Sequence, residues 1–168
     1  MLIAAEPAEL YPPFMGSQQE LRAGERAVTP PDANDAGLTF IGRIRTPWTS
    51  RSETPRQGRL DGPVCRIEIL PLWAPALQGL EAFEFVEVLY WLHQSRRDLL
   101  LQSPKDGEPC GTFALRSPVR PNPIGLSKVR LLGIGGNILR VQGLDCLDGT
   151  PLLDIKPDRC RFSPTPEA

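Results

Sequence analysis

Hydrophobic and polar residues alternate cleanly along Val64–Leu70. Cys65, Ile67 and Ile69 fall on one face of this run, and Arg66 falls on the other. A period of two residues is typical of a β-strand with one buried face. We therefore predict a strand here, with Cys65, Ile67 and Ile69 facing the core.

Other short apolar runs predict further strands. These runs are Leu38–Arg45, Phe83–His93, Leu126–Leu132, Ile138–Leu144 and Leu152–Lys156. The glycine-rich Gly133–Asn137 favours a hairpin turn between two of them. Residues 72–80 predict a short helix with a glycine stop, and residues 96–111 are interpreted as a polar excursion. The pattern predicts a mainly β fold of six or seven antiparallel strands, arranged as a sandwich or a barrel.

Composition supports strands and turns over long helices. Nineteen of the 168 residues are proline, about twice the usual share. The length suits one domain, and we predict an N-terminal extension over 1–37, partly ordered or flexible, a barrel domain over 38–160 and a tail over 161–168. The extension is acidic, whereas the remainder carries a small excess of Lys and Arg. That excess is compatible with an anionic partner.

Several classes of protein lack support in the sequence. The four cysteines lie far apart without a C-x-x-C pair, which argues against a zinc ribbon or an iron–sulfur cluster, and we predict no metal site. No glycine-rich loop precedes a helix as in dinucleotide-binding or P-loop proteins. No apolar run resembles a signal peptide or a membrane span. We therefore expect reduced thiols, a cytoplasmic location and no membrane partner.

The stretch Phe113–Gly125 carries the densest candidate chemistry. Each proline in it fixes φ near −65° and biases the preceding residue toward an extended backbone. Ser117, Arg120 and Asn122 therefore lie on a stiff backbone, and Gly125 is predicted to permit a sharp exit. Together with Arg116, Arg120 forms a pair of donors for an anion. The alternative is a proline-rich connection whose arginines are merely solvated.

Other polar loops add candidate ligand-binding residues. The single histidine, His93, follows an apolar run, where a structural role is the commoner one. Asp148–Thr150 taken alone is a turn. If such loops converge at one rim of a barrel, their side chains suit a small molecule or nucleotide with an adenine, a hydroxylated sugar and a carboxylate. The candidates are Arg56, Gln57, His93, Gln94, Arg116, Arg120, Asn122 and Asp148.

Six motifs extend the interpretation through a family resemblance. Residues 38 to about 157 resemble the TsaA-like (TrmO) family, β-barrel S-adenosylmethionine-dependent methyltransferases that act on tRNA. The matching segments are Ile41–Pro47, Pro55–Gln57, Gly79–Phe83, His93–Gln94, Gly111–Gly125 and Leu144–Pro157. The strings R-S-x-x-R-P-N-P-I-G and D-G-T-P-x-x-D-I-K-P are long and rarely combined, so the resemblance is specific. It departs at Asp158, where many relatives have Tyr.

The resemblance implies an antiparallel barrel, a homodimer and bound S-adenosylmethionine. It also implies methylation of the exocyclic nitrogen of threonylcarbamoyl-adenosine beside the tRNA anticodon. Some bacterial members carry a further C-terminal domain that helps to hold tRNA, and the present sequence ends at Ala168. A non-catalytic S-adenosylmethionine-binding or RNA-binding module is the alternative.

The resemblance also implies roles for particular residues. Arg120 and Asn122 are expected to face the tRNA or the modified base. Asp148 or His93 is expected to accept the proton that the attacking nitrogen loses. The cofactor is expected to contact Pro55, Arg56, Gln57, His93, Gln94, Arg116, Leu126, Leu147, Asp148, Gly149 and Thr150.

Overall fold

The computed structural model describes residues 20–29, 37–104 and 107–159. The chain divides into two compact units, each built from two stretches of sequence. Residues 1–30 and 93–122 contribute to the first unit, and residues 31–92 and 123–168 contribute to the second. The predicted tail over 161–168 lies outside the described residues.

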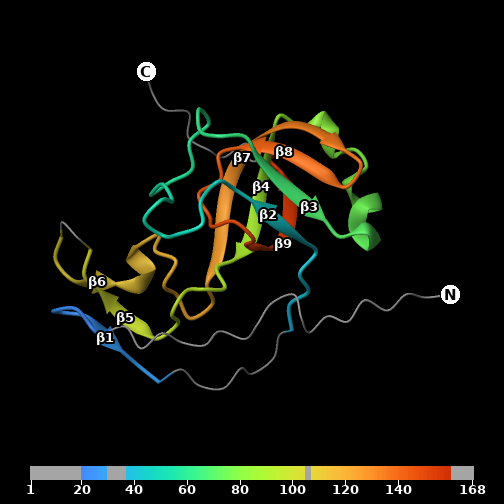
Figure 1. Ribbon diagram of the computed structural model, residues 1–168. Coiled ribbons are helices and arrows are strands. Elements are labelled where there is room, and N and C mark those ends of the chain that lie inside the picture. The colour runs from blue at the N-terminus through green and yellow to red at the C-terminus, as the bar shows by residue number, and fades with distance from the viewer. Residues whose placement is uncertain (1–19, 30–36, 105–106, 160–168) are drawn as a thin grey trace. The chain divides into compact units, whose positions relative to one another are not determined.

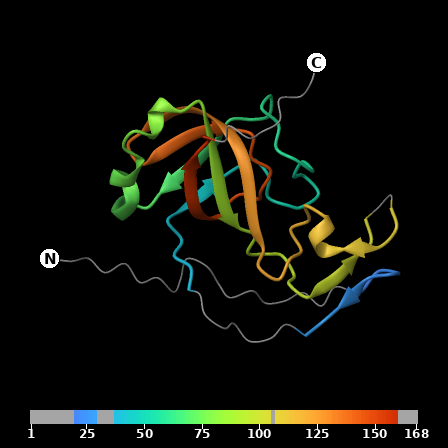
Figure 2. The ribbon, with the colours of Figure 1, turned by 180° about the vertical axis from the view of Figure 1, so that it is seen from behind.

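The second unit is a closed antiparallel barrel (Figures 1 and 2). Its strands, in their order around the barrel, are β2 (Gly42–Arg45), β3 (Cys65–Ile69), β8 (Ile138–Gln142), β7 (Ile124–Gly135), β4 (Phe85–Trp91) and β9 (Pro151–Pro157). Pairing of Gly42 with Leu152 joins β2 to β9 and closes the barrel. Closure leaves no unpaired edge strand. The predicted antiparallel barrel of six or seven strands is confirmed.

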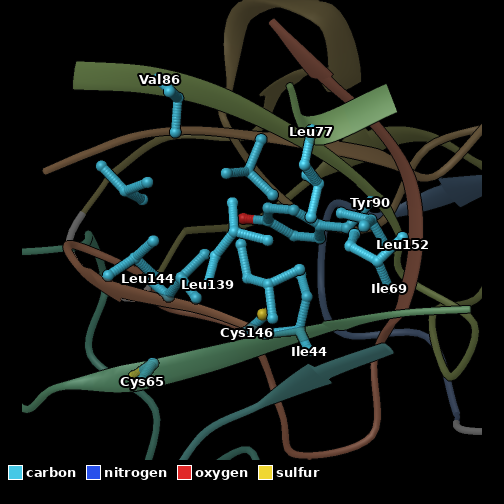
Figure 3. Close-up of a cluster of buried hydrophobic side chains, with 14 residues drawn as sticks. Ile44, Cys65, Ile69, Leu77, Val86, Tyr90, Leu139, Leu144, Cys146 and Leu152 are labelled. Atoms are coloured by element: carbon cyan, nitrogen blue, oxygen red, sulfur yellow. The ribbon is translucent and has the colours of Figure 1, made fainter. Parts of the chain in front are cut away.

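The barrel core is formed by the inward side chains of alternating strand positions (Figure 3). Ile44, Ile67 and Leu139 are fully buried, and Val86 and Val88 of β4 are as well. Burying one such aliphatic side chain stabilises the fold by about 1.5–3 kcal/mol. The predicted inward face of β3 is confirmed, because Cys65, Ile67 and Ile69 are all buried.

The predicted hairpin is formed by β7 and β8. Its two-residue connection contains Gly136, whose φ of +61° favours glycine. The Asn137 amide donates a hydrogen bond of 2.6 Å to the Ile69 carbonyl, which fixes the hairpin end to the end of β3. The strand β7 begins earlier than predicted, at Ile124.

The prediction that Gly125 permits a sharp exit is wrong. Gly125 lies inside β7 opposite Tyr90, and its φ is not positive. A Cβ at this position would stand 2.0 Å from Cε2 of the Tyr90 ring. Gly125 is therefore required for close packing between two strands, which no local pattern reveals.

The predicted helix after β3 is formed as two 3₁₀ segments. These are η1 (Pro71–Leu77) and η2 (Leu80–Ala82), separated by Gln78 and by Gly79, which has a φ of +86°. Pro75 inside η1 has no amide hydrogen to donate, which disfavours a longer α-helix. The strand predicted from Leu38 begins only at Gly42.

The first unit contains a small sheet in the order β1-β5-β6. Its elements are β1 (Arg26–Ala27), β5 (Leu99–Gln102), β6 (Cys110–Gly111) and the 3₁₀ segment η3 (Thr112–Ala114). The buried Gln102 amide donates to Thr112 Oγ1 and to the Val119 carbonyl, both at 2.9 Å. These bonds hold the stretch after η3 against the sheet.

The interpretation of residues 96–111 as a polar excursion is wrong, because they contain β5 and β6. These strands are stabilised by the buried, hydrogen-bonded Gln102 and by the pairing of β5 with β1 from the N-terminal extension. They therefore form without a regular alternation of apolar and polar residues. No helix among the described residues is long and apolar enough to cross a membrane.

Candidate functional site

The predicted site residues divide between the two units. The barrel unit holds Pro55, Arg56, Gln57, Leu126, Leu147, Asp148, Gly149 and Thr150. The first unit holds His93, Gln94, Arg116, Arg120 and Asn122. Convergence of the two groups at one rim stays a prediction, and each group has its own geometry.

In the barrel unit, the turn at Asp148 and Gly149 is fixed to the segment that contains β2. The Asp148 amide donates to the Trp48 carbonyl at 2.7 Å, and the Gly149 amide donates to the Ile44 carbonyl at 2.8 Å. In return, the Thr46 amide donates to Asp148 Oδ1 at 3.1 Å. These reciprocal bonds orient the Asp148 carboxylate from backbone groups.

A charged network extends from this carboxylate. Arg45 Nη1 lies 3.5 Å from Asp148 Oδ2, and Arg45 Nε donates to Glu68 Oε2 at 3.0 Å. The hydrogen bond to Glu68, with the charge of Asp148 added, raises the pKa of Arg45. The Asp148 side chain is 36% exposed, so it is oriented and still open to a solute. A carboxylate in this state accepts hydrogen bonds from hydroxyl groups or accepts a proton.

The rest of the turn combines the buried side chain of Thr150 with open space beside Gly149. Thr150 is buried, and its hydroxyl donates to the Leu147 carbonyl at 2.7 Å. Gly149 has a φ of +76°, and no heavy atom lies within 4 Å of the position that a Cβ would take. The Cα side of Gly149 is therefore open, while its amide is bonded to the Ile44 carbonyl. Leu147 is half-buried beside it, and Leu126 on β7 is 44% exposed.

The loop that carries Pro55, Arg56 and Gln57 is held through the residue that follows it. The Gly58 amide donates to Asp145 Oδ2 at 3.1 Å. A Cβ on Gly58 would stand 1.8 Å from the Gly143 carbonyl oxygen. The loop therefore lies directly against the segment between β8 and β9, with Arg56 and Gln57 exposed.

Asp145 is also bonded to two strands. Its Oδ1 accepts from the Tyr90 hydroxyl at 2.8 Å and from the Ser127 hydroxyl at 3.0 Å. Burial, and then the negative charge of Asp145, raise the pKa of Tyr90. The sequence analysis assigned no individual role to Asp145, Gly58 or Ser127. Their spacing along the chain gives no signal of this contact.

In the first unit, His93 and Gln94 lie at the start of the stretch 93–122. Their side-chain Nε2 atoms are 3.4 Å apart, and His93 is half-buried. This contact orients the imidazole ring from the neighbouring residue.

Arg120 is held by the proline-rich stretch itself. Its Nη1 donates to the Leu115 carbonyl at 2.5 Å, and its guanidinium lies 5.8 Å from the centroid of the Phe113 ring. Such a cation–π contact adds to the orientation of the guanidinium. Phe113 is 79% exposed, and the sequence interpretation gave it no role. Arg116 and Asn122 are exposed on the same stretch.

These features define a class of protein: a small closed antiparallel barrel with an oriented, partly exposed carboxylate, in a chain whose loops carry arginine side chains. Residues 43–161 match the tRNA-methyltransferase O N-terminal domain. The chain therefore belongs to the tRNA-methyltransferase O family, and the predicted family is confirmed.

Individual relatives agree with this assignment. The chain is 59% identical over 145 residues to the probable S-adenosyl-L-methionine-binding protein VirR of Rhizobium radiobacter, covering 86% of this chain and 83% of VirR. It is 36% identical over 129 residues to the tRNA (adenine(37)-N6)-methyltransferase of Escherichia coli, covering 70% and 55%. The crystal structure of TrmO from Pseudomonas aeruginosa is similar, with a TM-score of 0.64 and 34% identity, covering 80% of this chain and 61% of that one. The chain thus spans little more than half the length of the E. coli relative.

Proposed function

We propose that the protein is an S-adenosylmethionine-dependent tRNA methyltransferase that methylates the exocyclic nitrogen of threonylcarbamoyl-adenosine beside the anticodon. Membership in the tRNA-methyltransferase O family supports the reaction class. The name of the E. coli relative supports an adenine nitrogen of tRNA as the acceptor. VirR, named as a probable S-adenosylmethionine-binding protein, supports the cofactor.

The observation that carries this proposal is the orientation of Asp148. The motif that contains it is fixed through backbone bonds to Trp48, Thr46 and Ile44, while the carboxylate stays open to a solute. Its chemistry fits a cofactor with a hydroxylated sugar, since hydroxyl groups donate to carboxylates. The exposed Leu126, the half-buried Leu147 and the open space beside Gly149 fit the apolar and adenine parts.

S-adenosylmethionine supplies a methyl group that is already activated on a positively charged sulfur. The protein therefore acts chiefly by positioning the acceptor nitrogen in line with the breaking carbon–sulfur bond. Leu126 and Leu147 exclude water from the apolar part of the ligand. Arg116 or Arg56 pairs with its carboxylate.

Substrate orientation and proton removal fall to the remaining predicted residues. Arg120 and Asn122 orient the modified base. As the nitrogen–carbon bond forms, the nitrogen loses a proton, which Asp148 or His93 accepts. On the family resemblance, we also propose a homodimer that works in the cytoplasm with tRNA as its partner.

The test combines binding with nucleoside analysis. Isothermal titration calorimetry of the full chain with S-adenosylmethionine is expected to show binding. Incubation with tRNA that carries threonylcarbamoyl-adenosine is expected to add one methyl group to that nucleoside, measured by mass spectrometry. Binding with no methyl transfer to this tRNA would overturn the proposed substrate, and absence of binding would overturn the proposed cofactor.

A non-catalytic S-adenosylmethionine-binding or RNA-binding module is the second candidate. VirR and several archaeal relatives are named only as binding proteins, which favours this alternative. A strain without the gene distinguishes the two. If the protein is the enzyme, deletion of its gene leaves threonylcarbamoyl-adenosine unmethylated. If it is a binding module, the deletion leaves the nucleosides unchanged.

A further inference from the structure

We propose that Asp145 is a positioning residue that fixes the cofactor-binding surface of the barrel unit. This inference rests on the proposed function. It concerns a residue outside the set that the sequence assigned to the cofactor. This role is supported by three hydrogen bonds, by the segments that they join, and by the packing of one glycine.

Three segments that are distant in sequence meet at the Asp145 carboxylate. Oδ1 accepts from Tyr90 of β4 at 2.8 Å and from Ser127 of β7 at 3.0 Å. Oδ2 accepts from the Gly58 amide at 3.1 Å. Tyr90 and Ser127 are buried and also lie within hydrogen-bond distance of each other, at 2.9 Å. Hydrogen bonds to a carboxylate are stronger than those between neutral groups.

Two of the three partners, Gly58 and Ser127, adjoin residues that we assign to the cofactor. Gly58 directly follows Pro55–Gln57, and Ser127 directly follows Leu126. Asp145 itself lies two residues before Leu147 and three before Asp148. One carboxylate therefore sets the spacing of all three cofactor-binding segments of the barrel unit.

Asp145 acts through its neighbours and not on a ligand directly. Both of its carboxylate oxygens accept hydrogen bonds from uncharged protein groups, two of them hydroxyl groups of buried residues. Gly58 completes the arrangement, because a Cβ there would overlap the Gly143 carbonyl oxygen at 1.8 Å and displace the loop. Displacement of the loop lowers the affinity for the ligand even though every ligand-contacting side chain is still present.

The first test is Asp145→Ala in the full chain. We expect the dissociation constant for S-adenosylmethionine, measured by calorimetry, to rise at least tenfold. We also expect faster amide hydrogen exchange in the peptide that covers residues 51–60, because the Gly58 amide loses its acceptor. An unchanged dissociation constant, or unchanged exchange in that peptide, would overturn the inference.

Leu139→Ala is the matched control for a purely structural effect. Leu139 is fully buried on β8 and belongs to none of the three segments. We expect this variant to lower the melting temperature while the dissociation constant stays within twofold of wild type. If affinity falls in proportion to melting temperature in both variants, the positioning role is refuted.

Two further variants keep the test decisive if Asp145→Ala fails to fold. In Asp145→Asn the amide oxygen still accepts from Gly58 while its NH₂ group faces the two hydroxyls, so we expect affinity within threefold of wild type. Gly58→Ala leaves the bonds to Tyr90 and Ser127 in place but displaces the loop, and we expect at least a tenfold loss of affinity. The reverse order of the two variants would contradict the inference. If wild type itself binds no S-adenosylmethionine, the proposed function fails, while the exchange measurement still reports on the loop.

Discussion

At the scale of single residues, backbone donors and glycine packing decide which polar groups are available to a ligand. Asp148 and Asp145 lie three positions apart, yet they differ in environment. Asp148 is oriented by a backbone amide and stays 36% exposed, whereas Asp145 binds hydroxyl groups of two buried residues. The first is therefore suited to meet a ligand and the second to hold the structure around it.

Arg120→Ala is expected to weaken methylation more than cofactor binding. Arg120 is held by Leu115 and Phe113 on the stretch that we assign to the substrate. We expect kcat/KM for tRNA to fall at least tenfold, on the order of 1.4 kcal/mol or more, with the dissociation constant for S-adenosylmethionine within threefold of wild type. Arg140→Ala, which changes an exposed arginine of β8, is the control and is expected to leave both values near wild type. Equal losses in methylation and binding would contradict the assignment.

The buried thiols are expected to resist alkylation in the folded protein. Burial raises the pKa of Cys65 to about 11 and that of Cys146 to about 12. Because a thiol with a raised pKa keeps its proton, only about one part in a thousand of Cys65 is thiolate at pH 8, and this fraction grows as the pH rises. Peptide mapping after iodoacetamide treatment at pH 8 should find both residues unmodified in native protein and modified in urea. Rapid native labelling of either residue would show that the barrel opens there.

At the scale of elements, the barrel strands follow the two-residue period, but their spacing depends on close contacts between strands. On β7, Gly125 lies beneath the Tyr90 ring, whereas Gly135 near the end of the same strand has open space around it. The two glycines thus have different roles in one strand.

Gly125→Ala is expected to destabilise the fold by about 1–3 kcal/mol, because the added methyl group overlaps the buried Tyr90 ring. Gly135→Ala is the matched control, and its free energy of unfolding is expected to stay within about 0.5 kcal/mol of wild type. Urea denaturation measures both. Similar stability of the two variants would show that the strands adjust around Gly125 without cost.

At the scale of the whole molecule, the residues predicted to contact the cofactor divide between the two compact units. Pro55–Gln57 and Leu147–Thr150 belong to the barrel unit, and His93 and Arg116 belong to the other. A ligand that contacts both groups is expected to order both.

Hydrogen exchange with and without S-adenosylmethionine tests this expectation. We expect slower exchange at residues 55–60 and 145–150 of the barrel unit and at residues 93–97 and 116–122 of the other unit. The peptide that covers η1, Pro71–Leu77, carries no assigned residue and serves as the internal control. Protection confined to one unit would show that the cofactor site lies within that unit alone.

The sequence predicted the antiparallel strands because each strand buries one face, and the alternation of apolar and polar residues records that burial directly. The pattern left a sandwich or a barrel open, and the family resemblance implied the barrel. The same rule failed for β5 and β6. β5 pairs with β1, some seventy residues earlier in the chain, as well as with β6, and a buried hydrogen bond joins Gln102 to Thr112. Local chemistry already made Asp148 and Arg120 candidates, each beside a simpler explanation, and the family motifs then supplied their expected roles.

The sequence alone therefore determined the barrel strands, the hairpin and the family. Only the tertiary structure decided that Gly125 supports Tyr90, that Gly58 fits against Gly143, and that Asp145 joins three segments. The physical reason is that periodicity records which side chains leave water, a property of each segment by itself. Hydrogen bonds and close contacts between distant segments depend on how the chain is folded back on itself, and no local pattern encodes those distances.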